Sequence, residues 1–208
     1  MRAFIYCGGS LFAENIIEQP KKEDLVIAAD SGYLNARALG ARVDILVGDL
    51  DSLGGASVPE GIELVKLDCE KDFTDTQAAV ELAIERGCDD IVIVGGIGTR
   101  FDHSLSTAGI LGDMKSRGVH AYVTNGYNRI RYLENDSLLV PKTSGYKYLS
   151  VVAIDKMCKG VSVDGCKYPL KNAKISRNNQ FAVSNEIEGN IALVSVRKGA
   201  VLIIESRD

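Results

Sequence analysis

Asp49 and Asp51 are the residues of this sequence whose types and spacing most directly suggest chemistry. They follow a short apolar run that ends at Val47, and Gly48 separates that run from the acids. Like charges this close repel each other, and burial strengthens the repulsion. A cation between the carboxylates would remove this penalty, and Mg²⁺ prefers carboxylate oxygens, water and phosphate as ligands. The pair therefore predicts a Mg²⁺ site; the alternative is a solvated turn in which both acids cap local N–H groups.

A second group of acids lies in the stretch KDFTD, at the predicted start of a helix. Thr74 and Gln77 fit a capping box, which places Asp75 in the first helical turn, where free N–H groups stabilise a carboxylate. Asp72 and Asp75 could complete an acidic metal cluster, and Lys71 could contact a phosphate as a point charge. The alternative is that these residues only stabilise the helix start.

A third group is the glycine-rich stretch GGIGTRFDH at residues 95–103. Glycines allow backbone N–H groups to approach a phosphate closely, a helix start follows, and the Arg100 guanidinium suits phosphate oxygens. The spacing is neither GxGxxG nor GxxxxGK[ST], so the usual dinucleotide fingerprint and the Walker loop are excluded. For His103, a capping or packing role is the alternative to a role in binding.

The elements that must position these residues alternate between strand and helix in the first half of the chain. Apolar runs predict strands at 3–6, 25–29, 45–47, 62–67, 91–94 and 119–123, and helical patterns predict helices ending at 39 and spanning 74–87 and 104–117. This order is typical of an α/β fold, with a mostly parallel, Rossmann-like sheet and helices on both faces. Ligands of such sheets bind at the carboxyl ends of the strands, where the polar groups lie.

After about residue 128 the helical periodicity stops and short β-type runs replace it. These runs lie at 130–133, 138–140, 148–154, 160–163, 181–183, 191–196 and 201–204, with turn signals between them. The pattern predicts a small antiparallel sandwich or barrel. We therefore expect two domains, residues 1–127 and 128–208. The polar stretch VSNEIEGN reads as a hairpin loop, with a binding role as the alternative.

The bulk composition narrows the classes of partner. The 208 residues carry a formal net charge of -4 and no Lys/Arg-rich block, which argues against nucleic acid; a polyanionic small substrate remains open if a metal carries the positive charge. The five Cys residues contain no CxxC pair, as expected of reduced thiols in a cytoplasmic protein. No apolar run is long enough to predict a membrane segment.

Five motifs, in order along nearly the whole chain, resemble the thiamine pyrophosphokinase family. They read AADSG at 28–32, GDLDS at 48–52, KDFTD at 71–75, GGIGTRFDH at 95–103 and SNE at 184–186. Ser31 and Thr99 stand where the family usually has glycine. The sequence also has no Trp, which some members place near the thiamine ring, so another side chain would pack there.

This resemblance implies an ATP-binding α/β domain followed by a β-sandwich that helps to bind thiamine. It implies a homodimer with active sites between the subunits. The implied reaction moves the pyrophosphoryl group of ATP to the hydroxyl of thiamine and gives thiamine diphosphate and AMP, with Mg²⁺ as cofactor.

The resemblance also assigns residues to roles. The implied catalytic residues are Asp49, Asp51, Asp72 and Asp75; of these, Asp49, Asp51 and Asp75 would hold the metal, and Asp75 is our candidate for a general base. The implied nucleotide-binding residues are Asp30, Gly32, Lys71, Gly95, Gly96, Gly98, Thr99, Arg100, Asp102 and His103. The implied thiamine-binding residues are Ser184 and Asn185.

Two other functions fit parts of the pattern. A phosphatase of the haloacid dehalogenase type also places DxD after a strand, but its first Asp is a covalent nucleophile near the N-terminus, whereas Asp49 follows two earlier strands. A sensor of nucleotide or thiamine would keep the pocket and lose the catalysis, and the intact acids argue against it.

Overall fold

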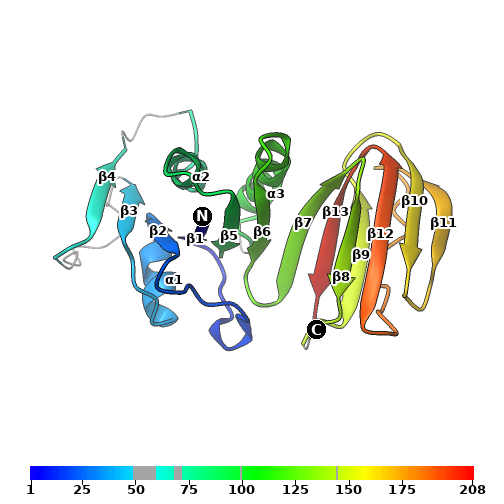
Figure 1. The fold of residues 1–208 in the computed structure, drawn as a ribbon, viewed down its shortest axis with the longest axis horizontal. Coiled ribbons are helices and arrows are strands. Elements are labelled where there is room, and N and C mark those ends of the chain that lie inside the picture. The colour runs from blue at the N-terminus through cyan, green and yellow to red at the C-terminus, as the bar shows by residue number, and fades with distance from the viewer. Residues whose placement is uncertain (49–59, 68–71, 99, 144) are drawn as a thin grey trace. The chain divides into compact units, whose positions relative to one another are not determined.

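The structure is a computed structural model that describes residues 1–48, 60–67, 72–98, 100–143 and 145–208 (Figure 1). The chain divides into two compact units, Met1–Gly126 and Tyr127–Asp208. The sequence placed the boundary after residue 127. Four of the predicted site residues lie outside the described residues: Asp49, Asp51, Lys71 and Thr99.

The first unit is a parallel sheet of six strands in the order β4-β3-β2-β1-β5-β6. The strands are β1 (Arg2–Tyr6), β2 (Leu25–Ala29), β3 (Ile45–Gly48), β4 (Glu63–Lys66), β5 (Asp90–Val94) and β6 (His120–Thr124). The helices are α1 (Gly32–Ala38), α2 (Asp75–Glu85) and α3 (Phe101–Ser116), and a short 3-10 turn, η1, covers Ala13–Asn15. The predicted fold class is confirmed.

Helices cover both faces of this sheet because its central strands are apolar on both sides. On one face Phe4 and Tyr6 of β1 pack in a cluster with Ala36 of α1. On the other face Cys7, just after β1, contacts Thr76 of α2, and α3 lies beside α2 (Figure 1). The strand order reverses between β1 and β5, which is the point where open α/β sheets bind ligands.

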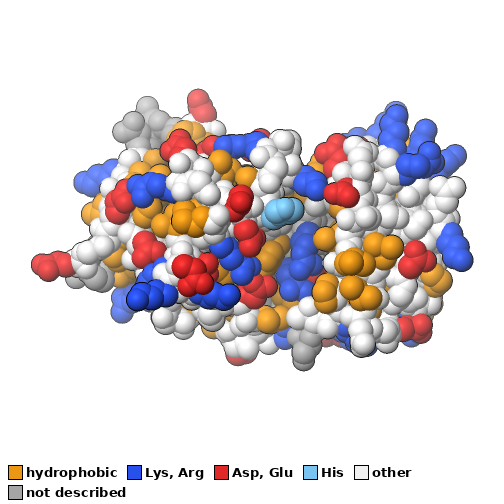
Figure 2. All heavy atoms as spheres, in the orientation of Figure 1, with side chains coloured by type: hydrophobic (Ala, Val, Ile, Leu, Met, Phe, Trp, Pro, Cys, Tyr) orange, Lys and Arg blue, Asp and Glu red, His pale blue; other side chains and the backbone are white. Residues whose placement is uncertain are grey.

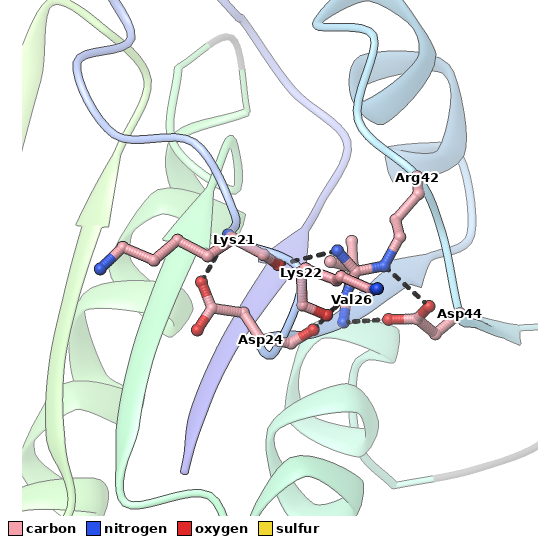
Figure 3. A network of polar contacts seen from close by, with 6 residues as sticks. All are labelled: Lys21, Lys22, Asp24, Val26, Arg42 and Asp44. Carbon is pink, nitrogen blue, oxygen red and sulfur yellow. Dashed lines mark hydrogen bonds and ion pairs between the residues drawn. The ribbon is translucent and has the colours of Figure 1, made fainter.

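A polar network fixes the amino ends of β2 and β3 (Figure 3). The Arg42 guanidinium donates to Asp44 Oδ1 at 3.1 Å and to the carbonyl oxygens of Lys21 at 2.8 Å and Lys22 at 3.1 Å. Asp44 Oδ2 in turn accepts from the Val26 N–H at 2.8 Å. These polar groups hydrogen-bond to one another and stabilise the amino end of the sheet. Ligands are therefore expected at the carboxyl end.

The second unit is an antiparallel β-sandwich with sheets in the orders β7-β13-β9 and β11-β10-β12-β8. Its strands are β7 (Asn128–Glu134), β8 (Ser137–Pro141), β9 (Tyr148–Ala153), β10 (Cys158–Asp164), β11 (Leu170–Ile175), β12 (Ile191–Lys198) and β13 (Ala200–Ser206). Inward side chains of both sheets, among them Val151, Val161, Val194 and Ile203, form one core cluster. The predicted sandwich is confirmed.

Two elements of the second unit differ from the sequence expectation. The predicted strand at 181–183 is an extended segment outside any strand, and β11 was not predicted. β11 reads LKNAKI and exposes both of its lysines at the edge of the sheet, so it lacks the apolar alternation on which the prediction relied. Within the described residues, no helix has the length and apolar character needed to span a membrane.

Candidate functional site

A cavity of about 340 Å³ lies at the carboxyl ends of β1, β2 and β5, at the reversal of strand order. Loops after these strands and the first turns of α2 and α3 form its wall. Six predicted site residues lie on this wall: Asp30, Asp75, Gly96, Gly98, Arg100 and His103. Four others, Gly32, Asp72, Gly95 and Asp102, are described but lie off the wall.

Asp30 is the most unusual carboxylate of the cavity. It follows β2 directly and has a φ of 50°, a left-handed conformation that short polar residues adopt more readily than others. Its Oδ1 atom is buried and has no hydrogen-bond partner among the described residues. Because leaving a buried carboxylate oxygen unpaired is costly, this atom is suited to a ligand that completes its coordination.

Asp75 brings a second carboxylate to the same cavity from the start of α2. The side chain of Thr74 accepts a hydrogen bond from the Gln77 N–H at 3.2 Å, which confirms Thr74 as the helix cap. The helix therefore begins at Asp75, and the positive end of its dipole favours a carboxylate there.

The carboxylates fit a hard divalent cation, although the described residues alone do not form a complete site. They contain no group of three or more His, Cys, Asp or Glu side chains that could hold a metal ion. Two of the three predicted ligands, Asp49 and Asp51, lie outside the described residues. However, Gly48, which precedes them, is so close to Asp30 that a Cβ on it would lie 3.2 Å from the Asp30 Cβ. Gly48, the last residue of β3, thus lies beside Asp30.

The glycine loop after β5 shapes the wall, but its amides already have partners. The N–H groups of Gly95, Gly96 and Gly98 donate to Thr124 O at 2.8 Å, Gly8 O at 2.7 Å and Ser104 Oγ at 3.0 Å. A Cβ on Gly95 would lie 2.4 Å from the carbonyl oxygen of Cys7, so this glycine permits close packing of two loops. The sequence prediction had assigned these amides to phosphate.

Arg100 forms the N-cap of α3 and makes an exposed ion pair with Asp102. Its Nη2 and Nε atoms lie 2.6 and 3.3 Å from the two carboxylate oxygens of Asp102, and this guanidinium holds the pKa of Asp102 below its usual value. Exposed pairs of this kind contribute little to stability. The guanidinium is therefore free to shift toward an anionic ligand in the cavity.

The helix α3 begins at Phe101, three residues earlier than predicted. His103 and Thr107 are therefore four residues apart on one helical face, and both line the cavity. Two wall residues, Thr107 and Thr76 of α2, were not predicted, because the glycine-rich motif ends at His103 and the KDFTD motif ends at Asp75. Helical spacing from a correct start would have found Thr107.

Two further wall residues have specific packing roles. Burial raises the pKa of the Cys7 thiol to about 12, and Thr76 Oγ1 donates to its Sγ at 3.3 Å, so Cys7 is protonated at neutral pH and is no thiolate nucleophile. Ser31 replaces a glycine of the family pattern, and a Cβ on Gly8 would lie 2.4 Å from its Oγ. The glycine at position 8 thus makes room for the serine at position 31.

The predicted thiamine-side residues lie in the second unit beside β9. Ser184 is exposed and has a φ of 57°, another left-handed conformation outside glycine. Asn185 is buried, and its amide group bonds to the backbone N–H and C=O of Tyr168 at 3.0 and 2.7 Å. Ser184 is thus exposed, whereas the side-chain amide of Asn185 hydrogen-bonds within the unit.

The first unit defines a class of protein before any comparison is made. A doubly wound parallel sheet with a carboxylate- and glycine-lined cavity at its switch point is the architecture of nucleotide-binding α/β proteins.

Comparison with known proteins then gives the family. The profile described as "Thiamin pyrophosphokinase, catalytic domain" matches residues 18–123, and that described as "Thiamin pyrophosphokinase, vitamin B1 binding domain" matches residues 136–201. The chain therefore belongs to the thiamin pyrophosphokinase family and is a member of a family of transferases.

Individual relatives agree with this assignment. A thiamine pyrophosphokinase of Bacillus subtilis is 28% identical over 139 residues, which are 67% of this chain and 65% of that protein, slightly under two thirds of the relative's length. The crystal structure of a thiamin pyrophosphokinase family protein from Enterococcus faecalis has a TM-score of 0.85 at 27% identity, with all of both chains covered. The crystal structure of the Bacillus subtilis thiamine pyrophosphokinase has the same fold, with a TM-score of 0.85 at 24% identity and full coverage of both chains.

Proposed function

We propose that this protein transfers the pyrophosphoryl group of ATP to the hydroxyl of thiamine, with Mg²⁺, and forms thiamine diphosphate and AMP. Family membership supports the thiamine substrate and the product. The observation that carries the nucleotide and metal part is the Oδ1 atom of Asp30, which is buried and lacks a partner among the described residues; Asp30 lies on the cavity wall with Asp75. A carboxylate in this state is suited to a cation that also binds phosphate.

In the proposed reaction, the thiamine hydroxyl oxygen bonds to the β-phosphorus of ATP. The bond between that phosphorus and the oxygen bridging to the α-phosphate breaks, and AMP leaves with the bridging oxygen. The hydroxyl proton passes to a carboxylate, for which Asp75 is our candidate because it lies in the cavity at the start of α2. Most of the rate enhancement in such transfers comes from positioning and electrostatics.

The residues of the chain divide this work. Asp49, Asp51 and Asp75 would hold Mg²⁺, assisted by Asp30 on the same cavity wall as Asp75 and by Asp72, three residues earlier in the sequence, and the ion would neutralise charge on the transferring group. Arg100 and Lys71 would add positive charge at the phosphates, and His103 would contact the nucleotide from α3. Since the amides of Gly95, Gly96 and Gly98 are occupied, we assign these glycines to the shape of the wall.

The same proposal includes a homodimer. The second unit exposes Leu139, Ile191 and Leu193, and Leu139 lies directly opposite Leu193 in the pairing of β8 with β12. Figure 2 shows hydrophobic side chains gathered over these strands. Exposed apolar patches of this kind mark association surfaces, and we infer that a second copy covers this one. Light scattering of Leu193→Asp should then show a loss of dimer that Lys171→Asp does not.

We also infer a reducing, cytoplasmic location. The described cysteines Cys7, Cys88, Cys158 and Cys166 are all free and buried, as expected of a protein that does not rely on disulfides.

The activity is tested by mixing the protein with ATP, Mg²⁺ and thiamine and quantifying AMP, ADP, phosphate and thiamine diphosphate. We expect AMP and thiamine diphosphate in equal amounts, and neither when thiamine or Mg²⁺ is omitted. ADP or phosphate formed without thiamine would overturn the proposal in favour of a phosphatase. Thiamine binding without any product would indicate a sensor.

A further inference from the structure

The segment at 182–185 runs antiparallel to β9 and contains one residue too many. Leu149 and Asn185 exchange both backbone hydrogen bonds, at 2.7 and 3.0 Å, and the Val151 N–H donates to Ala182 O at 2.7 Å. Three steps along the segment, from 182 to 185, therefore match two steps along β9, from 149 to 151. This is the pattern of a β-bulge, a feature that redirects a side chain and recurs beside functional sites.

Ser184 is the residue that the bulge redirects. Its φ of 57° is uncommon outside glycine, its side chain is exposed, and its hydroxyl has no hydrogen bond to any described residue. Its backbone N–H has no acceptor in the ladder and donates instead to Ser150 Oγ at 2.9 Å. The Ser150 hydroxyl on β9 thus supplies the acceptor that the extra residue would otherwise lack.

Asn185 fixes the end of the same bulge from the other side. It is 7% exposed, and its Oδ1 accepts from the N–H groups of Tyr168 at 3.0 Å and Glu186 at 2.9 Å. Its Nδ2 donates to Tyr168 O at 2.7 Å. Because its carbonyl oxygen already has two donors, Asn185 acts as an anchor, and Ser184 carries the free polar group of the motif.

We propose that Ser150 is a positioning residue for thiamine, one that holds Ser184 in the left-handed conformation that presents its free hydroxyl to the ligand. This inference rests on the proposed function and on the thiamine-binding role that the family resemblance implies for Ser184. The neighbouring side chains of Phe181 and Val183 are about half exposed, and they suit the apolar faces of a heterocycle whose polar edge Ser184 would bond. The side chain of Asn185 also bonds to the backbone of Tyr168, and Tyr168 exposes 61% of its surface.

The same unit contains a matched control for this device. Asn172 has a φ of 48°, and its N–H donates to Ser162 Oγ at 3.0 Å. The same arrangement, in which a serine hydroxyl accepts from the backbone N–H of a left-handed residue, thus occurs between β10 and β11, away from the SNE motif. Ser162→Ala removes an equivalent hydrogen bond without touching Ser184.

The test compares Ser150→Ala, Ser150→Thr and Ser162→Ala by steady-state kinetics and thermal unfolding. We expect Ser150→Ala to raise the KM for thiamine roughly five- to tenfold, the effect of one neutral hydrogen bond, with kcat and the KM for ATP within about twofold of wild type. Ser150→Thr keeps the hydroxyl and should restore the thiamine KM. Ser162→Ala should lower the melting temperature about as much as Ser150→Ala does, and it should leave the thiamine KM unchanged.

A double-mutant cycle with Ser184→Ala separates positioning from general damage. If Ser150 acts through Ser184, the effect of Ser150→Ala on the thiamine KM disappears in the Ser184→Ala background. Independent effects, or an unchanged thiamine KM in Ser150→Ala, would overturn the inference while wild-type turnover upheld the proposed function. Wild-type protein that neither binds thiamine in calorimetry nor converts it would overturn both.

Discussion

At the residue scale, two buried side-chain oxygens lack hydrogen-bond partners among the described residues, and they differ in what they do. Asp30 Oδ1 lies in the cavity wall, where a ligand can reach it. The Tyr6 hydroxyl is also buried and has no partner among the described residues, but it packs in the apolar cluster beneath α1. The first is suited to function, and the second is a cost to stability.

Tyr6→Phe should therefore stabilise the protein. Removing a buried hydroxyl that lacks a hydrogen bond should raise the free energy of unfolding by about 1 kcal/mol at pH 7. Burial raises the pKa of Tyr6 to about 12, so the wild type loses stability as the pH rises from the unfolded pKa of about 10 toward 12. The variant lacks this loss, and its advantage should grow above pH 10.

Urea unfolding of both proteins at pH 7 and pH 10.5 measures this difference. A variant less stable than the wild type at pH 7 would show that the hydroxyl has a partner after all.

Single residues were predictable from the sequence where the residue type has few structural roles. The sequence predicted the Thr74 cap correctly, and the acids Asp30 and Asp75 that it singled out lie on the cavity wall. It assigned the amides of Gly96 and Gly98 to a ligand, although Gly8 O and Ser104 Oγ occupy them. Backbone partners depend on which loops meet in space, and that information is absent from the local sequence.

At the scale of elements, strands with apolar runs were predictable and polar edge strands were not. The buried strands β1, β2 and β5 appear close to their predicted bounds because each is an almost continuous apolar run. The edge strand β11 forms without an apolar run. The segment at 181–183 has an apolar pattern but pairs only partly with β9. Pairing partners, rather than composition, decided both cases.

The contact between α1 and β1 gives a prediction at this scale. A Cβ on Gly32 would lie 2.0 Å from Tyr6 O, a backbone atom that cannot move aside without displacing the central strand. Gly32→Ala should therefore lower the free energy of unfolding by about 3 kcal/mol. Gly109→Ala is the control, because Gly109 lies in α3 with nothing within 4 Å of the added methyl group.

The control should gain about 0.5–1 kcal/mol, since alanine favours the helix over glycine. Equal, small effects of both substitutions in chemical unfolding would show that α1 does not pack this closely on β1.

At the scale of the whole molecule, both units have an apolar core, and the second unit also buries charge. The first buries apolar strands between helices, whereas one end of the sandwich contains an ionic network. Glu205 is 2% exposed and accepts hydrogen bonds from Arg129 at 2.5 and 2.7 Å and from Arg131 at 2.6 Å. Two cations thus depend on one buried carboxylate, which makes its charge hard to replace.

Glu205→Gln should destabilise the protein by about 3–5 kcal/mol, because it removes the buried negative charge that accepts hydrogen bonds from both guanidinium groups. Glu188→Gln makes the same change at an exposed position and should leave the melting temperature within about 1 °C of wild type, since exposed charges contribute little. Calorimetry of both variants checks this. A melting temperature of Glu205→Gln equal to that of the control would contradict the proposed dependence.

We propose that the transfer takes place in the cavity at the strand reversal. The most direct measurement is the rate of thiamine diphosphate formation by Asp30→Asn at saturating ATP, Mg²⁺ and thiamine, beside Asp113→Asn, an exposed acid of α3 off the cavity wall. Asparagine tolerates the left-handed conformation of residue 30, so the fold should be kept. We predict that kcat of Asp30→Asn falls about 100-fold, with an unchanged or higher melting temperature, and that Asp113→Asn behaves as wild type. Turnover of Asp30→Asn within about twofold of wild type would contradict the assignment of the reaction to this cavity.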